Sequence, residues 1–112
     1  MFARHYTEVP AGVVGDGAVN TSMRWLIAEK DGAPNFYMRM VEIGAKVNTP
    51  WHEHPWEHEV FLVEGSGRLV GESESYDLKP GDTALVPGGE MHRFDNTGET
   101  VMKMLCLIPA QK

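Results

Sequence analysis

Apolar residues along the chain fall in short runs, and glycine, proline or asparagine separates most runs from the next. This punctuation is typical of short β-strands joined by tight turns. No window of helical length shows the period of about 3.6 residues, so we expect little helix. Strands are expected at residues 23–29, 36–43, 59–64, 68–71, 76–79, 83–86, 91–94 and 100–108, after an irregular N-terminal segment at residues 1–22.

A flat, open sheet built from so many short strands would leave long unpaired edges. Closure into a β-barrel or a double-sheet jelly roll removes most of these edges. We therefore expect an all-β fold in which residues 1–112 form a single domain. A length of 112 residues is enough for one hydrophobic core of ordinary size.

Two of the expected strands carry apolar residues on both faces, at residues 60–63 and 105–108. An antiparallel strand with one face in water normally alternates between apolar and polar residues. Both faces of these strands are therefore expected to be covered, either by another part of the chain or by a second subunit. A homodimer is the simpler explanation for so short a chain.

The charge balance excludes several classes of partner. Ten Lys and Arg against sixteen Asp and Glu give a formal net charge of −6, without a basic cluster. Nucleic-acid binding needs concentrated positive charge, and a membrane span needs about 20 apolar residues in one run. The N-terminus lacks the apolar stretch of a signal peptide, and a single cysteine fits a reducing compartment. We expect a cytoplasmic protein that acts on a small molecule, with no nucleic acid or membrane as partner.

Four of the five histidines, at positions 52, 54, 58 and 92, form a pattern that points to chemistry. His52 and His54 share one face if the chain is extended there, and His58 opens the next apolar run. A turn at residues 87–89 brings in His92 on a separate short strand. Imidazole suits Mn, Fe, Co, Ni, Cu and Zn, and spacing alone does not choose among them. The sequence therefore predicts a divalent transition-metal site.

Residues near this cluster predict a small-molecule pocket. By strand parity Glu59 points away from His58, so it is not expected to compete as a ligand. Arg39 would offer a cation to an acidic group on the ligand, unless it sits in a surface ion pair. The pocket is expected to be lined by Arg39, Met40, Trp56, Phe94 and Cys106.

The turn before the last histidine resembles the second motif of the cupin superfamily, G-x5-P-x-G-x2-H-x3-N. Gly81, Pro87, Gly89, His92 and Asn96 match every specified position of that motif.

The first cupin motif, G-x5-H-x-H-x3-E-x6-G, is matched at His52, His54 and Gly65. Two positions depart from it. Lys46 stands at the initial glycine, and His58 stands where the motif has glutamate. Exchanging a carboxylate for an imidazole raises the net charge of a divalent centre and makes it a stronger Lewis acid.

Residues 31–109 resemble small single-domain manganese cupins with a four-histidine centre. The resemblance implies a cupin-type β-barrel dimer (a double-stranded β-helix, or jelly roll). It also implies that His52, His54, His58 and His92 bind Mn²⁺, with Fe, Ni, Cu, Co and Zn as alternatives.

The same resemblance implies three possible functions. The first is a metal-dependent oxidoreductase that activates peroxide or dioxygen on a small organic substrate, as in oxidative alkene cleavage. The alternative is a Lewis-acid lyase or isomerase, such as a hydroxynitrile lyase. The third is a non-catalytic module that binds a small ligand. Apart from a histidine freed from the metal, the sequence shows no obvious general base, which slightly favours the redox function over acid–base chemistry.

Overall fold

Short β-strands dominate the protein, as the spacing of turn residues predicts. A computed structural model describes residues 1–15 and 17–111, so Asp16 and Lys112 lie outside the described residues. Two 3-10 turns, η1 (Tyr6–Glu8) and η2 (Glu29–Asp31), are the helices of this part of the chain, and neither is long and apolar enough to span a membrane. The strands are β1 (Gly12–Val13), β2 (Thr21–Ile27), β3 (Phe36–Ile43), β4 (His58–Glu64), β5 (Gly67–Gly71), β6 (Ser75–Leu78), β7 (Thr83–Val86), β8 (His92–Asn96) and β9 (Met102–Pro109).

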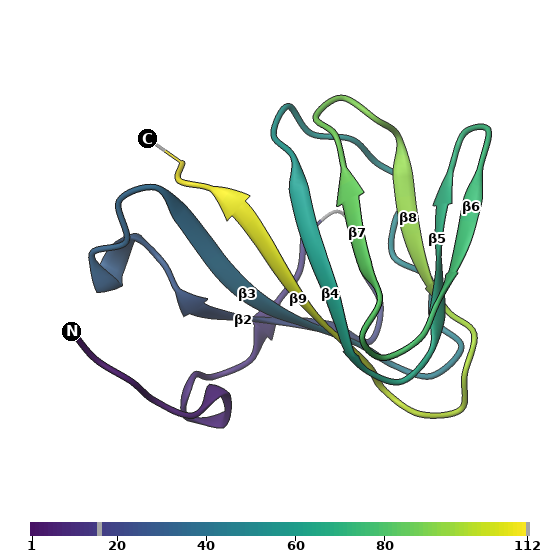
Figure 1. Cartoon of the computed structure of the whole chain (residues 1–112). Coiled ribbons are helices and arrows are strands. Elements are labelled where there is room, and N and C mark those ends of the chain that lie inside the picture. The colour runs from purple at the N-terminus through teal and green to yellow at the C-terminus, as the bar shows by residue number, and fades with distance from the viewer. Residues whose placement is uncertain (16, 112) are drawn as a thin grey trace.

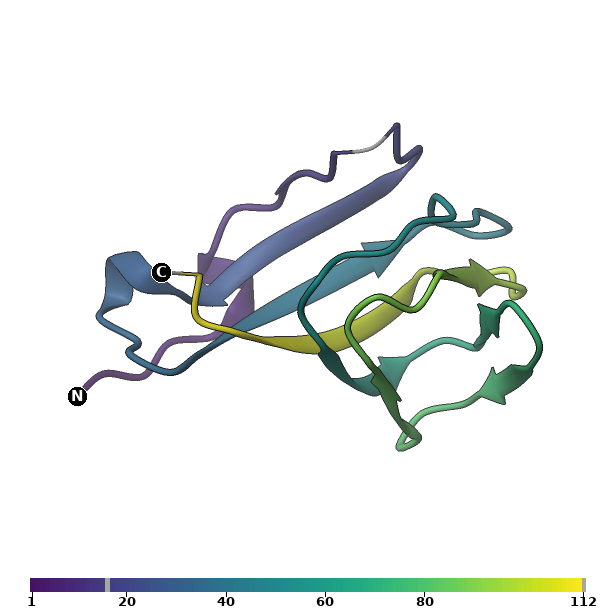
Figure 2. The same cartoon turned by 90° about the horizontal axis from the view of Figure 1, so that it is seen from above.

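These strands form two antiparallel sheets. One has the order β1-β2-β3-β9-β4-β7, and the other has the order β6-β5-β8. Figure 1 shows both sheets curving around a shared interior, with β2 and β3 at one end and β5 and β6 at the other. The view from above shows β4 and β9 lying between these two ends (Figure 2). The expected all-β jelly-roll fold is confirmed.

The interior between the sheets is a single main core. Ile43, Leu62, Met102 and Met104 are at most 2% exposed and belong to one cluster with residues from both sheets. Burying a side chain of this size stabilises the fold by about 1.5–3 kcal/mol. Residues in β9 are buried and half-buried in strict alternation, as the two-residue period of a strand requires.

Asn96, the last residue of the second cupin-like motif, joins the segment at Ile43 and Gly44 to the turn at residues 96–100. Its side-chain amide donates to the carbonyls of Ile43 and Gly44 over 2.9 Å and to that of Thr100 over 2.8 Å. Its side-chain oxygen accepts from the amide of Gly98 over 2.9 Å. Asn96 is 2% exposed, so each of these bonds satisfies a polar group that water does not reach.

The N-terminal segment is more regular than the sequence predicts. Residues 1–22 hold η1, β1 and the start of β2, whereas we expect an irregular segment that is at most weakly extended at residues 9–22. Thr21 and Ser22 extend β2 because they pair with Ile43 and Glu42 of β3. These polar residues carry no hydrophobic signal, and their place in the sheet comes from this long-range pairing.

The outer face of β4 is not covered by the described part of the chain. Phe61 and Val63 are 43% and 41% exposed, and Leu85 of the neighbouring β7 is 62% exposed. The expectation that another part of the chain covers both faces is therefore wrong for the described residues. A second subunit on this face stays a prediction.

We predict that Phe61 and Leu85 lie at the interface of a homodimer. Replacing both with aspartate would place charges in a buried apolar interface, so the doubly substituted protein should be a monomer. Multi-angle light scattering at micromolar concentration measures the change, and Tyr76→Asp on β6, where the tyrosine is 53% exposed, is the matched control. A monomer mass for the unaltered protein would contradict the prediction.

Candidate metal centre

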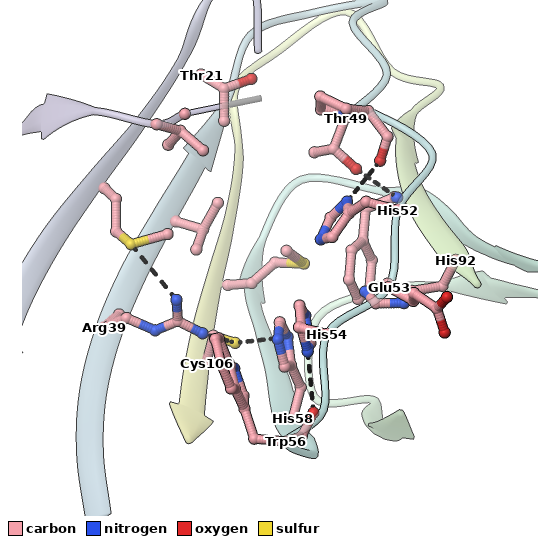
Figure 3. Close-up of a pocket in the computed structure, with 17 residues that line it drawn as sticks. Thr21, Arg39, Thr49, His52, Glu53, His54, Trp56, His58, His92 and Cys106 are labelled. Atoms are coloured by element: carbon pink, nitrogen blue, oxygen red, sulfur yellow. Dashed lines mark hydrogen bonds between the residues drawn. The ribbon is translucent and has the colours of Figure 1, made fainter. Parts of the chain in front are cut away.

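Three of the predicted ligands meet at one point in the barrel. The ligand nitrogens of His52, His54 and His92 all lie within 4.8 Å of one another. His92 is the first residue of β8, and His52 joins it through an isolated antiparallel bridge with hydrogen bonds of 3.1 and 2.9 Å in the two directions. Figure 3 shows the rings grouped on one wall of a pocket. Residues forty positions apart in sequence are thus held together by backbone pairing.

The segment that carries His52 and His54 is a loop, whereas the two-residue spacing suggests extended backbone with both rings on one face. Within residues 49–57, His52 makes the isolated bridge and no strand forms. The loop is held instead by a 2.8 Å hydrogen bond from the Gly89 amide to the His54 carbonyl. A Cβ at position 88 would collide with the carbonyl of Pro55, so this close approach needs glycine.

Backbone carbonyls fix the tautomer of the three clustered rings. Each ring places Nδ1 against a carbonyl two residues away in sequence, at 2.8 Å for His52 and His92 and at 2.9 Å for His54. A carbonyl only accepts, so Nδ1 carries the proton and donates it, which leaves the Nε2 lone pair free. The Nε2 atoms of His54 and His92 are buried and have no hydrogen-bond partner. Nitrogen lone pairs arranged in this way fit a metal ion.

His58, the fourth predicted ligand, lies against this group without being part of it. Its ring stacks on that of His54, with 4.1 Å between centroids and 5° between planes. Its Nδ1 lies 3.2 Å from the Sγ atom of Cys106, and its buried Nε2 has no partner. The structure therefore groups three histidines and places the fourth beside them with an unsatisfied nitrogen.

Burial lowers the pKa values of three rings, those of His54, His58 and His92. Desolvation, followed by the proximity of His54, lowers the pKa of His58 to about 3 from an ordinary value of 6.5. Desolvation is also the main cause that lowers the pKa values of His54 and His92. Neutral imidazole is the form that binds a cation, so the environment prepares the cluster for metal at neutral and mildly acidic pH.

The histidines face a cavity of about 280 Å³. Trp56 forms one wall and stacks on His54, with ring centroids 5.0 Å apart. Met40 is buried but does not line the cavity, because it alternates with Arg39 and Val41, which do. Four of the five expected pocket residues line the cavity together with the histidines: Arg39, Trp56, Phe94 and Cys106. The cavity is also lined by residues that the sequence does not predict: Val14, Gly15, Thr21, Met23, Val41, Thr49, Pro50, Glu53 and Met104.

Several of these additional residues come from parts of the chain in which the sequence predicts no strand. Val14 precedes β2, Thr21 begins it, and Thr49 lies in the loop before the histidines. Thr49 accepts a 2.8 Å hydrogen bond from the Phe94 amide, which attaches the loop to β8. The β-branched threonine that begins β2 is the one local signal that could have extended that strand toward the pocket.

Arg39 lies across the cavity from His52, His54 and His92, and Cys106 lies between Arg39 and His58 (Figure 3). Arg39 is 7% exposed, so the alternative of a surface ion pair is wrong. Cys106 is a free, buried cysteine, and desolvation raises the pKa of its thiol. A neutral thiol thus lies between the guanidinium and the ring of His58.

Comparison with known proteins relates this architecture to a family. The family model described as a cupin domain matches residues 39–108. The solved structure of the polyketide cyclase RemF from Streptomyces resistomycificus is 34% identical with a TM-score of 0.91, and the match covers 99% of this chain and 80% of that chain.

Two curated relatives give further matches. The uncharacterized protein MJ1618 from Methanocaldococcus jannaschii is 26% identical over 102 residues, which cover 90% of this chain and 80% of that protein. L-ectoine synthase from Rhodococcus erythropolis is 44% identical over 50 residues, which cover 43% of this chain and 36% of the synthase. The second match therefore spans little more than a third of the synthase.

We predict that the metal-free protein loses stability as the pH falls from about 6.5 toward 3. In this window the unfolded chain protonates the histidine at position 58 while the folded protein keeps it neutral, so unfolding takes up protons. The effect of one such ring is at most about 1.4 kcal/mol per pH unit. Thermal unfolding of the wild type and of His58→Gln across this range measures it.

His58→Gln should flatten the dependence of the melting temperature on pH between 6.5 and 3. His5→Gln, which removes an exposed histidine outside the cavity, should leave the slope as it is. Equal slopes for the wild type and His58→Gln would show that this ring is not held neutral in the folded state.

Proposed function

The chain belongs to the cupin family, and we propose that it is a metal-dependent enzyme that promotes ring closure of a polyketide-type substrate. The observation that carries the proposal is the convergence of buried, unpaired imidazole nitrogens on a mainly apolar cavity. The identity of 34% to a polyketide cyclase along nearly the whole chain supports the choice of reaction.

The cluster fits a divalent ion. His52, His54 and His92 would hold it through Nε2, and we propose His58 as the fourth ligand because its Nε2 is also buried without a partner. Mn²⁺ is the first ion to test, with Fe, Ni, Cu, Co and Zn as alternatives, since imidazole suits all of them. A divalent ion in this site would supply Lewis acidity, which stabilises negative charge developing on a carbonyl oxygen.

The remaining residues of the cavity would bind and shield the substrate. Val41, Phe94 and Met104 offer apolar surface from both sheets, and Trp56 adds an aromatic wall. A cavity of about 280 Å³ lies just below the usual range for small-molecule sites, about 300–1,000 Å³. It therefore suits a small substrate or the folded end of a longer one. Excluding water strengthens each electrostatic interaction inside the site.

The oxidoreductase function stays a prediction that ranks second. Peroxide chemistry in this cavity would act beside the thiol of Cys106 and the thioethers of Met23 and Met104. Thiols and thioethers are the protein groups that peroxides oxidise most readily. The cavity is thus poorly protected against such a reaction, whereas ring closure under Lewis-acid catalysis uses no oxidant.

We predict that His54→Ala and His92→Ala lower metal retention by more than about tenfold, since each removes an imidazole ligand. His58→Ala should also weaken retention by about tenfold or more and abolish turnover. Elemental analysis after dialysis measures the metal content, and His5→Ala, outside the cluster, is the control. Full retention in His58→Ala would reduce the proposed site to three histidines.

We predict that the metal-loaded protein converts a short linear β-polyketone to a cyclic product with loss of water, and that it leaves alkenes with hydrogen peroxide and cyanohydrins unchanged. Mass spectrometry of the products separates the three reactions. Alkene cleavage without ring closure would replace the proposal by the oxidoreductase function, and cyanohydrin cleavage would replace it by the lyase function. Binding of the polyketone without turnover of any of the three would favour the non-catalytic module.

A further inference from the structure

Arg39 is a buried cation in the wall of the cavity. Arg39 lies near the middle of β3 and is 7% exposed. The guanidinium carbon lies 5.4 Å from the centroid of the Trp25 ring, its neighbour across β2 and β3. Figure 3 shows the side chain reaching from β3 toward Cys106 and the imidazoles. The charged end is therefore enclosed by the protein and directed at the site.

The guanidinium has only weak acceptors. Nη2 donates to the Sγ atom of Cys106 over 2.9 Å, and Nη1 donates to the Sδ atom of Met23 over 3.6 Å. Sulfur is a poor acceptor, and the buried Nε has no partner. No carboxylate among residues 1–15 and 17–111 forms an ion pair with Arg39. A buried cation without a counter-charge is costly, so the structure leaves a charge to be satisfied.

The other arginines of the chain behave differently. Arg4, Arg24, Arg68 and Arg93 each pair with an aspartate or glutamate at 2.6–3.3 Å. These four lie outside the cavity lining. The arginine in the cavity is thus the one that the described residues leave without a carboxylate.

We propose that Arg39 binds a carboxylate of the substrate. Two parallel N–H groups of a guanidinium match the two oxygens of a carboxylate, and such charge-assisted pairs are stronger than neutral hydrogen bonds. The inference deepens the proposed function and rests on it for the position of the reacting end, which would lie at the histidines. The substrate class is then an apolar carbonyl compound with a carboxylate at one end.

Arg39 is close enough to the histidines for one ligand to contact both the guanidinium and the histidine site. The thiol of Cys106 lies between Arg39 and His58. Its Sγ atom is 2.9 Å from Nη2 of Arg39 and 3.2 Å from Nδ1 of His58. Neutral imidazoles do not offset the charge of a bound divalent ion, so a loaded site adds two positive charges to that of Arg39. An anionic substrate reduces this excess, whereas a neutral one leaves it in an apolar cavity.

The test compares 2-naphthoate with 2-naphthamide, which have the same ring system and differ in charge. Tryptophan fluorescence or calorimetry measures both affinities on the metal-free protein. The wild type should bind the carboxylate about tenfold or more tightly than the amide. Arg39→Gln should remove this preference, mainly by weakening the affinity for the carboxylate. Arg93→Gln, which removes the same charge from a position paired with Asp95, should keep the preference.

Measuring both affinities without metal separates the role of Arg39 from the proposed cyclase function. If the protein fails to bind metal or to close a ring, the comparison of 2-naphthoate with 2-naphthamide still tests Arg39. No preference in the wild type, or a preference retained in Arg39→Gln, would overturn the role of Arg39. If Arg39→Gln does not fold, Arg39→Lys carries the test, since lysine keeps the charge but lacks the two parallel donors. The preference should then fall at least severalfold, and an unchanged preference would overturn the proposal.

Discussion

The hydrogen bonds from three imidazole Nδ1 atoms to backbone carbonyls determine what this site can do. They assign the proton to one nitrogen of each ring and direct the other nitrogen into the barrel. The carbonyls belong to the same loops as the histidines, so the backbone pairing of His52 with His92 positions donors and acceptors together. If that pairing were lost, the rings would be free to rotate and the cluster would have no defined centre.

Burial of the unpaired Nε2 atoms of His54, His58 and His92 carries a free-energy cost that a cation would relieve. Nitrogen lone pairs that are shielded from water and lack a donor are unfavourable in an apolar cavity. The same shielding lowers the pKa values of His54, His58 and His92, since a charged ring would be more costly than a neutral one. The protein therefore keeps its ligands in the form that coordinates metal. Arg39 has the converse deficiency, because its buried positive charge lacks an anionic partner.

Much of the strand framework could be predicted from the sequence because turns and alternation are local signals. The ranges 36–43 and 83–86 match β3 and β7, and parity correctly separates the exposed Glu59 from the buried His58. The conformation of the loop at residues 49–57 could not be predicted, since contacts with β8 and Gly88 determine it. The start of β2 likewise depends on pairing with β3. The hydrophobic pattern of the sequence does not show that Thr21 lines the cavity, because Thr21 is polar.

The proposed metal ligands and the charged wall of the cavity come from different parts of the fold. The histidines lie in one loop and at the starts of β4 and β8, whereas Arg39 and Thr21 lie on β3 and β2. Substitutions on β2 and β3 can therefore reshape the wall without moving the loop that orients the rings. This division gives the scaffold room to diverge toward new ligands while the geometry of the histidine cluster stays fixed.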